Sequence, residues 1–302
     1  MFNFLSVCLF IIVILGVFLL WVCMFDTHRF VVSKHTFTSA KIKKPLKFVM
    51  LSDLHGWQYG RDNKLLLEAI YKLAPDGILI SGDMITALKT TKTDKVEAFL
   101  AALKEKYPIY YANGNHEQKI KLFPERYGDL AERYAESLKR IEVKPLINEK
   151  VLLEDAGVAI YGLEMDHGYY KRMANITMET AYLDEILGNR DEKYFSVLLA
   201  HNPDYFKTYS DWGAELVLSG HVHGGIARLP FLGGVIAPSL KLFPKYDGGV
   251  YHERESTMIL GRGIGTHSPN VRFFNPGELV VVDLVPQTSN AKDKLEITSE
   301  NE

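Results

Sequence analysis

Short apolar runs that alternate with amphipathic segments are the feature that most constrains how this chain can fold. LKFVMLSD is followed by NKLLLEAIYKL, whose apolar residues have helical spacing, and GILISGD is followed by DKVEAFLAALKEK. Continuous apolar strands of this kind are typical of a sheet that is buried on both faces. The alternation therefore predicts a layered α/β fold with a largely buried sheet.

The same alternation continues along most of the chain. PIYYANGNHE precedes the helical GDLAERYAESLKR, and the later runs are VAIYGLE, FSVLLAHNP and AELVLSGHVH. GGVYHE, STMILGRG and GELVVVDLV follow as strands without a helix between them, which indicates an antiparallel portion. We expect one domain over residues 45–286, a length that a single α/β unit can reach. The polar residues 287–302 are predicted to be a disordered tail.

Residues 4–25 form an uncharged apolar run that stands apart from this pattern. A helix of that length spans roughly 30 Å, the thickness of the hydrocarbon core of a bilayer. A cleaved signal peptide is the alternative, but the first three residues carry no basic side chain and no small-x-small cleavage site follows. We expect a single-pass membrane anchor over residues 1–25 and a juxtamembrane linker over residues 26–44.

Charge gives two further expectations. After the apolar run a single Asp26 stands against the basic residues Arg29, Lys34, Lys41, Lys43 and Lys44. The positive-inside rule then favours a catalytic domain on the cytoplasmic side of the membrane. The net charge of −2 shows no basic excess, so no nucleic-acid partner is expected.

Five of the apolar runs end in residues that can bind a metal ion. Taken singly, Asp53 is explained as a helix cap or turn residue, Asp83 and Asn115 as turn residues, and a lone histidine as a surface or hydrogen-bonded core residue. Ligands of open α/β sheets gather outside the carboxyl ends of the strands, so residues at five strand ends should converge on one rim. The pattern predicts a metal site there, with seven candidate ligands: Asp53, His55, Asp83, Asn115, His201, His221 and His223.

The number of candidates favours two divalent metal ions over one. Seven ligands are too many for a single tetrahedral zinc ion, whereas one bridging carboxylate would give each of two ions four protein ligands. In two-metal sites the ions lie roughly 3.5–4 Å apart and hold the attacking and leaving oxygens of an in-line displacement. Mixed Asp, Asn and His ligands suit Mn²⁺, iron or Zn²⁺.

The motifs D-x-H, G-D, G-N-H-E, a later H, and G-H-x-H, in this order, resemble the signature of the calcineurin-like metallophosphoesterase superfamily. The resemblance covers about residues 45–285. LAHNPDYF, GHVHGG and IAPSLKLFPKY resemble its membrane-anchored bacterial branch, which is related to phosphodiesterases and UDP-2,3-diacylglucosamine pyrophosphatases. The resemblance implies a four-layer α/β/β/α sandwich, a point that the strand count alone leaves open.

The resemblance also implies two ligand sets that share one residue. For the first metal it implies Asp53, His55, Asp83 and His223, and for the second Asp83, Asn115, His201 and His221. His116 would be the histidine beside the scissile phosphate that binds no metal, and Glu117 would support the site without taking part in the reaction. The implied activity is hydrolysis of phosphodiester or pyrophosphate bonds by a metal-bridging hydroxide, with the help of His116.

The substrate is less constrained, and the sequence indicates only a phosphate-containing small molecule or a lipid-linked substrate. Tyr169 and Tyr170 could stack on a base or leaving group, and Arg262 and Arg272 could meet phosphate oxygens, but ordinary structural roles stay open for all four. The anchor and the apolar stretch RLPFLGGVIAPSLKLFPKY favour a lipid-specific pyrophosphatase as the alternative function. A metal-binding scaffold without activity and a nuclease are further alternatives. The sequence does not indicate the oligomeric state.

Overall fold

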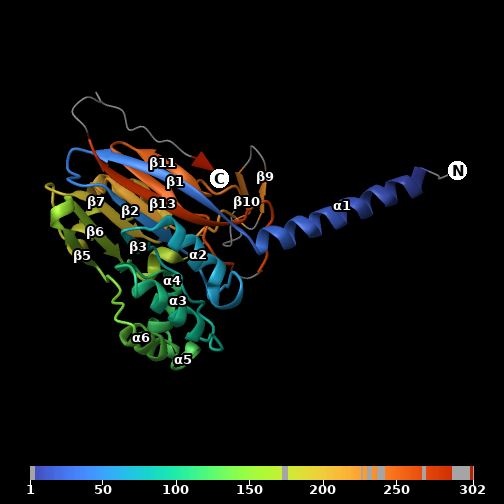
Figure 1. The fold of residues 1–302 in the computed structure, drawn as a ribbon, viewed down its shortest axis with the longest axis horizontal. Helices are drawn as coiled ribbons and strands as arrows, with labels where there is room; N and C mark the ends of the chain where they lie inside the picture. The colour runs from blue at the N-terminus through green and yellow to red at the C-terminus, as the bar shows by residue number, and fades with distance from the viewer. Residues whose placement is uncertain are drawn as a thin grey trace.

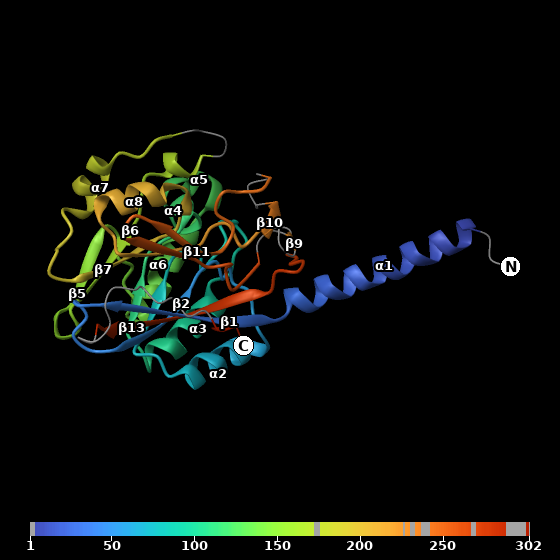
Figure 2. The same ribbon diagram turned by 90° about the horizontal axis from the view of Figure 1, so that it is seen from above.

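The computed structural model describes residues 4–171, 176–225, 227–229, 233–236, 242–266, 270–287 and 300–301. Two six-stranded sheets lie face to face and helices cover their outer faces (Figure 1). In Figure 2 the layers follow one another as α7 and α8, one sheet, the other sheet, and α2 with α3. The expected four-layer α/β/β/α sandwich is confirmed.

The first sheet has the strand order β14-β1-β13-β2-β3-β4. Its strands are β14 (Glu300–Asn301), β1 (Phe30–Ser39), β13 (Gly277–Pro286), β2 (Leu46–Leu51), β3 (Gly77–Ile80) and β4 (Ile109–Tyr111). The strands β2, β3 and β4 are parallel, whereas β13 is antiparallel to β2 and parallel to β1. The carboxyl ends of β2, β3 and β4 therefore share one edge.

Part of the linker predicted over residues 26–44 is instead strand β1 of the first sheet. Phe30–Ser39 pair residue by residue with Gly277–Pro286 along their whole length. Phe37 is only 2% exposed, but Ser33 and His35 are buried on the same strand. Because polar residues occupy part of its buried face, β1 has no continuous apolar run. Of the tail predicted to be disordered, residues 288–299 and 302 lie outside the described residues.

The second sheet has the order β11-β12-β8-β7-β6-β5. Its strands are β11 (Gly249–Glu253), β12 (Ser256–Leu260), β8 (Leu216–Ser219), β7 (Phe195–Ala200), β6 (Val158–Leu163) and β5 (Glu149–Leu153). The four central strands are parallel, and β11 and β5 run antiparallel at the edges. A separate antiparallel pair joins β9 (Ala227–Leu229) to β10 (Gly233–Ile236). The predicted antiparallel portion is found in the pair β11–β12, whereas β13 lies in the first sheet, antiparallel to β2 and parallel to β1.

The helices bury one-sided apolar stripes against the sheets. In α3 the buried residues Val96, Phe99, Leu100 and Leu103 recur at i, i+3, i+4 and i+7, the spacing of one helix face. The α-helices of the domain are α2 (Lys64–Leu73), α3 (Asp94–Lys104), α4 (Asn115–Leu122), α5 (Pro124–Tyr127), α6 (Leu130–Arg140), α7 (Thr180–Leu187) and α8 (Phe206–Trp212). Short 3₁₀ turns are η1 (Arg61–Asn63), η2 (Glu154–Ala156), η3 (His167–Tyr170) and η4 (Pro203–Tyr205).

Each central strand divides its side chains between two cores. Phe48 and Met50 of β2 lie in the core between the two sheets, whereas Val49 and Leu51 pack under α2 and α3. In β7, Leu198 likewise packs in the third core, under α7 and α8. Burying one such side chain contributes roughly 1.5–3 kcal/mol to folding. This double burial explains why the strands have continuous apolar sequences.

Helix α1 (Phe4–Thr27) extends away from the sandwich, in both views, and nearly all of its apolar side chains are exposed. By length and composition it is able to cross a membrane. The helix enters the domain at Thr27, close to the start of β1.

Candidate metal centre

The seven candidate ligands lie together at one rim of the sandwich. They follow β2, β3, β4, β7 and β8, with Asn115 as the first residue of α4 and the others in loops. Three overlapping groups place their ligand atoms within 4.8 Å of one another: Asp53 with His55 and His223, His55 with Asp83 and His116, and Asp83 with His201 and His221. Groups so close, drawn from separate strands, could hold metal ions.

Asp83 lies at the centre of this cluster. Its Oδ1 accepts a hydrogen bond from the backbone N–H of His116 at 2.8 Å, which ties the loop after β3 to the start of α4. Its Oδ2 lies 3.0 Å from His201 Nε2 and 3.8 Å from His55 Nε2. One carboxylate oxygen therefore supports the fold, while the other faces two histidines from different strands.

Asp53 also connects two ligand loops, through a single carboxylate oxygen. Its Oδ1 accepts the backbone N–H of His221 at 2.9 Å and lies 3.3 Å from His223 Nε2. His223 Nε2 is in turn 3.1 Å from His55 Nε2, and the two rings stack. The carboxylate thus joins the loop after β2 to the loop after β8.

Five of the seven candidates have a left-handed backbone conformation, with φ between 51° and 76°: Asp53, His55, Asp83, His221 and His223. For residues other than glycine this conformation costs about 1–3 kcal/mol and is concentrated at functional sites. Glycine would remove the strain but provides no ligand. Backbone bonds from Asp53 N–H to Gly82 O and from His55 N–H to Asp83 O, both 3.0 Å, hold the strained loops together.

Glycines are required where two of these loops approach most closely. A Cβ at Gly220 would clash with Asp53 Oδ2, and a Cβ at Gly114 would clash with Asp83 Oδ1. Neither residue has a positive φ, so side-chain volume is the constraint here and backbone conformation is not.

Hydrogen bonds fix the histidine that faces Asp83. His201 Nδ1 lies 2.6 Å from the carbonyl oxygen of Ser81, which can only accept, so Nδ1 carries a proton. Although burial opposes it, attraction to Asp83 and Asp53 raises the pKa of His201 to about 9, so the ring loses the proton on Nε2, which faces the cluster, when it binds a metal. This is the arrangement in which a histidine binds a metal through one nitrogen and is oriented through the other.

Burial and charge set the protonation states of the cluster. Burial raises the pKa of Asp53 to about 6, and burial, assisted by the charge of His201, lowers the pKa of His221 to about 3. Burial also disfavours ionisation of Asp83, but attraction to His201 and His116 holds the pKa of Asp83 well below its usual range. His221 is consequently neutral at neutral pH, as a metal ligand must be.

Unsatisfied polar atoms test whether metal ions fit. Asp53 Oδ2 and Asn115 Oδ1 are both buried and have no hydrogen-bond partner among the described residues. Buried polar atoms without a partner are costly, and these two belong to the predicted ligand set. Carboxylate and amide oxygens that lack other partners fit divalent metal ions.

His116 lies beside the cluster in the first turn of α4. Its Nδ1 accepts a hydrogen bond from the backbone N–H of Ala87 at 2.7 Å, so the proton of the neutral ring is on Nε2. Nε2 is 3.9 Å from Asp83 Oδ2, and the ring lies edge-on to His55 with centroids 4.9 Å apart. The imidazole therefore presents an N–H donor to the space in front of the cluster.

Glu117 holds two of the ligand loops in place. Its carboxylate accepts the backbone N–H groups of Asp83 at 2.9 Å, Met84 at 2.8 Å and Gly114 at 3.0 Å, together with the hydroxyl of Tyr111 at 3.0 Å. The geometry agrees with the supporting role expected for this residue. Sequence reasoning did not find the tyrosine beneath it.

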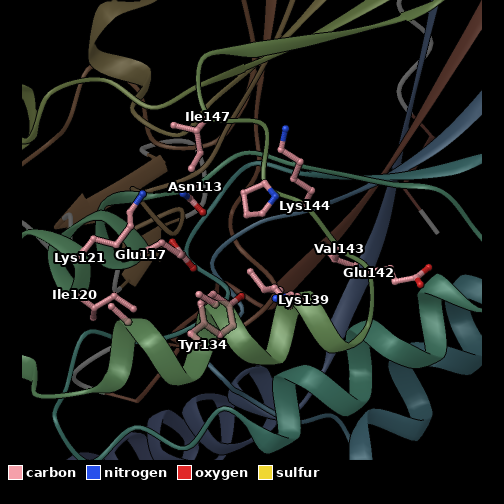
Figure 3. Close-up of a pocket in the computed structure, with 14 residues that line it drawn as sticks. Asn113, Glu117, Ile120, Lys121, Tyr134, Lys139, Glu142, Val143, Lys144 and Ile147 are labelled. Carbon is pink, nitrogen blue, oxygen red and sulfur yellow. The ribbon is translucent and has the colours of Figure 1, made fainter.

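A cavity of about 460 Å³ is lined in part by Glu117. Figure 3 shows it between α6, which carries Tyr134 and Lys139, and the segment with Lys144 and Ile147. Its walls are mainly apolar, and Tyr134 contributes a hydroxyl 2.9 Å from that of Tyr111. The cavity therefore touches the site directly at Glu117, and Tyr134 joins it to Tyr111 as well.

The two tyrosines proposed for substrate binding have different positions. Tyr170 borders the cluster, with its ring centroid 5.4 Å from that of His221. Tyr169 packs against Tyr182 and Tyr205, and its carbonyl accepts a hydrogen bond from the Tyr205 hydroxyl at 3.1 Å. Tyr169 is only partly buried and packs against the core under α7 and α8, so substrate binding by either tyrosine stays a prediction.

The two arginines proposed to meet phosphate are already bonded. Arg272 is 2% exposed, and its guanidinium donates to the backbone carbonyls of Gly263, Gly265 and Asn275, among others. Arg262 lies 3.3 Å from a carboxylate oxygen of Glu278. The structure contradicts a substrate-binding role for Arg272 and gives Arg262 an ion pair within the fold.

Asn275 is a supporting residue that the sequence did not reveal. Its side-chain amide donates to the carbonyls of His223 and Gly225, both at 2.7 Å. It is fully buried. Its motif, FFNPG, resembles an ordinary turn, so only the folded contact with the His223 segment identifies it.

Comparison with known proteins agrees with this geometry. The family model described as calcineurin-like phosphoesterase matches residues 46–225, more than half of the chain. An uncharacterised metallophosphoesterase of Campylobacter jejuni is 30% identical over 251 residues, which make up 80% of this chain and 60% of that protein. The phosphodiesterase YaeI of Escherichia coli is 25% identical over 74% of this chain and 76% of its own length. The UDP-2,3-diacylglucosamine pyrophosphatase LpxG of Chlamydia muridarum is 24% identical over 78% of this chain and 83% of its own length.

Proposed function

Because the chain belongs to the calcineurin-like phosphoesterase family and is a metallophosphoesterase, we propose that it uses two divalent metal ions to hydrolyse phosphodiester or pyrophosphate bonds. The observation that carries the proposal is the position of Asp83 Oδ2 between His201 and His55. A carboxylate oxygen shared by histidines from two strands is the arrangement that a bridging ligand requires.

The proposed ligand sets meet at Asp83. One set is Asp53, His55, Asp83 and His223, and the other is Asp83, Asn115, His201 and His221. The unpartnered Asp53 Oδ2 supports the first set, and the unpartnered Asn115 Oδ1 supports the second. Mn²⁺, iron and Zn²⁺ are all compatible with these donors.

Metal ions bound there supply positive charge for the phosphoryl oxygens and a water of lowered pKa as the nucleophile. The chain provides the remaining parts of the reaction. His116 Nε2–H donates a hydrogen bond to the leaving oxygen and so stabilises its developing charge, and the Ala87 N–H keeps the ring in that orientation. Asn115 offers a neutral oxygen and adds no negative charge near the phosphate.

Membrane anchoring by α1 is part of the proposal. Its length and its exposed apolar side chains support a single-pass anchor. The basic residues that follow it favour a catalytic domain on the cytoplasmic side, which protease protection in sealed vesicles of known orientation would test. In vesicles whose cytoplasmic face is inside, we expect protease to cleave the domain only after the vesicles are opened.

A lipid-specific pyrophosphatase is the second candidate. The similarity to two Chlamydia proteins described as UDP-2,3-diacylglucosamine pyrophosphatases, 24% and 22% identical, supports it together with α1. An inactive metal-binding scaffold has less support, because every ligand of the signature and His116 are present.

A substrate panel tests the proposal. The full chain, solubilised in detergent, stripped of metal and reloaded with Mn²⁺, is given a p-nitrophenyl phosphodiester, the corresponding monoester and a nucleotide-sugar pyrophosphate. Turnover of the diester or the pyrophosphate that disappears on chelation is the expected result. If none of the three is hydrolysed, a lipid-linked nucleotide sugar in mixed micelles separates the second candidate from a scaffold.

A further inference from the structure

Five large apolar side chains are exposed near the point where α1 enters the domain. They are Leu229, Leu242, Phe243, Val271 and Phe274, each between 37% and 63% exposed. Single exposed apolar residues are common on protein surfaces, but several in one region mark a contact surface. We refer to these five residues as the collar.

The collar is held together by backbone pairing. Phe273 forms a parallel bridge with Ala227 and accepts the N–H of Arg228 at 3.0 Å, which attaches the segment around Val271 and Phe274 to β9. Strand β9 pairs with β10, and the N–H of Phe243 donates to Val235 of β10 at 3.0 Å. In Figures 1 and 2, β9 and β10 lie beside the domain end of α1.

Contacts with α1 fix the level of the collar along the helix. The backbone N–H of Arg272, between two collar residues in the sequence, donates to Thr27 Oγ1 at 2.9 Å. Just before Thr27, the rings of Trp21 and Phe25 stack, and the Arg29 guanidinium lies 4.9 Å from the Phe25 centroid. Tryptophan and arginine at the end of an apolar helix are typical of the boundary between hydrocarbon and headgroups.

The collar is also joined to the metal centre. Asn275, the residue after Phe274, holds the carbonyl oxygens of the candidate ligand His223 and of Gly225. On the other side of the centre, Trp57 follows the loop with Asp53 and His55, and its ring lies 5.6 Å from that of His28 at the end of α1. Both flanks of the metal centre are therefore near the domain end of the helix.

We propose that the collar inserts into the interfacial layer of the bilayer that α1 crosses, so that the metal centre acts on phosphate groups at the membrane surface. The collar is continuous with the helix and carries apolar side chains at headgroup level, as interfacial segments do. The inference rests on the proposed anchoring by α1 and narrows the proposed substrates to membrane-borne ones.

Depth-dependent fluorescence quenching tests the inference in the full chain. Single labels are placed at Phe243→Cys and Phe274→Cys in a Cys8→Ser, Cys23→Ser background, and the protein is reconstituted into nanodiscs. Cys23, retained alone, reports the helix itself. Ile147→Cys is the matched control, because Ile147 is an exposed apolar residue beside the cavity of Figure 3.

Lipids with spin labels near the headgroup are expected to quench both collar labels about as strongly as the Cys23 label, and to leave the Ile147 label bright. Collar labels as bright as the Ile147 label, with Cys23 quenched, would overturn the inference. If Cys23 is not quenched either, α1 does not enter the bilayer and the inference fails with it.

A kinetic arm separates this inference from the proposed function. In Phe243→Ser, Phe274→Ser protein, turnover of a water-soluble diester should be unchanged, whereas turnover of a phosphodiester lipid in vesicles should fall. Equal rates on the vesicle substrate for variant and wild type would contradict insertion of the collar into the bilayer. The proposed hydrolase function would not be affected by that result. If the wild type hydrolyses neither substrate, the proposed function fails, and the quenching result still decides the collar.

Discussion

At His116 a backbone contact determines how a side chain can act. The Ala87 N–H occupies Nδ1, so the ring faces the metal centre as an N–H donor. Replacing it in His116→Gln should leave metal content unchanged and lower kcat by about 10²-fold, the size of effect that follows loss of a donor to developing charge. Steady-state kinetics with metal analysis check this, and unchanged turnover would remove the role.

Glu117 supports the site by accepting backbone N–H groups from two ligand loops. In Glu117→Gln an amide NH₂ would face some of these donors, and an unsatisfied buried group costs about 1–3 kcal/mol. Denaturant unfolding should show a loss of this size, whereas the exposed Glu136→Gln on α6 should unfold like the wild type. Equal stability of the two variants would contradict the assignment.

His35, which lies outside the metal centre, should make the stability of the protein depend on pH. Burial lowers its pKa below 6.5, although the nearby Glu278 opposes this. The unfolded chain then binds a proton more readily than the folded one, so this residue destabilises the protein as pH falls below 6.5. The free energy of unfolding of His35→Gln should therefore decline less than that of the wild type between neutral and mildly acidic pH. Parallel declines would show that His35 is not responsible.

The sequence predicted residues of the site whose side chains follow strand ends, and it failed where backbone or burial decides. The seven candidate ligands converge because parallel strands end at one edge. Ala87 and Asn275 could not be found, since one acts through its N–H and the other through the carbonyls it holds. Arg272 was misjudged because its neighbours do not indicate that its guanidinium would be buried among carbonyls.

Strand β1 shows where sequence patterns fail for whole elements. The central strands were recognised because both of their faces are apolar, whereas β1 buries Ser33 and His35. The domain therefore begins at the end of α1, well before residue 45.

A pair of truncations tests the role of β1. A fragment that begins at His28 should be folded and active, whereas one that begins at Pro45 loses Phe37 from the core and the partner strand of β13. Loss of one such side chain costs roughly 1.5–3 kcal/mol before the strand pairing is counted. Circular dichroism during heating should show a much lower Tm, or no transition, for the shorter fragment. Equal Tm values for the two fragments would show that β1 does not stabilise the domain.

In the whole molecule, the helix, the collar and the ligand rim lie at the same end. Loops after β2 and β8 carry ligands, and contacts near both loops reach the residues around Thr27. Sequence alone could not reveal this arrangement, because β9, residues 270–275 and α1 are far apart in the chain. This arrangement supports the proposed action on phosphate groups at a membrane surface.

Metal stoichiometry measured together with turnover tests the central claim most directly. The full chain in detergent is stripped of metal, titrated with Mn²⁺ and assayed for bound ions per chain and for diester hydrolysis, next to Asp83→Asn. Asparagine keeps an oxygen that can accept the backbone N–H of His116 but removes the negative charge of the proposed bridging ligand. The account predicts two ions per active wild-type chain, with both the second ion and turnover lost in Asp83→Asn. A fully active chain with one ion, or an Asp83→Asn variant that keeps two ions and its turnover, would contradict it.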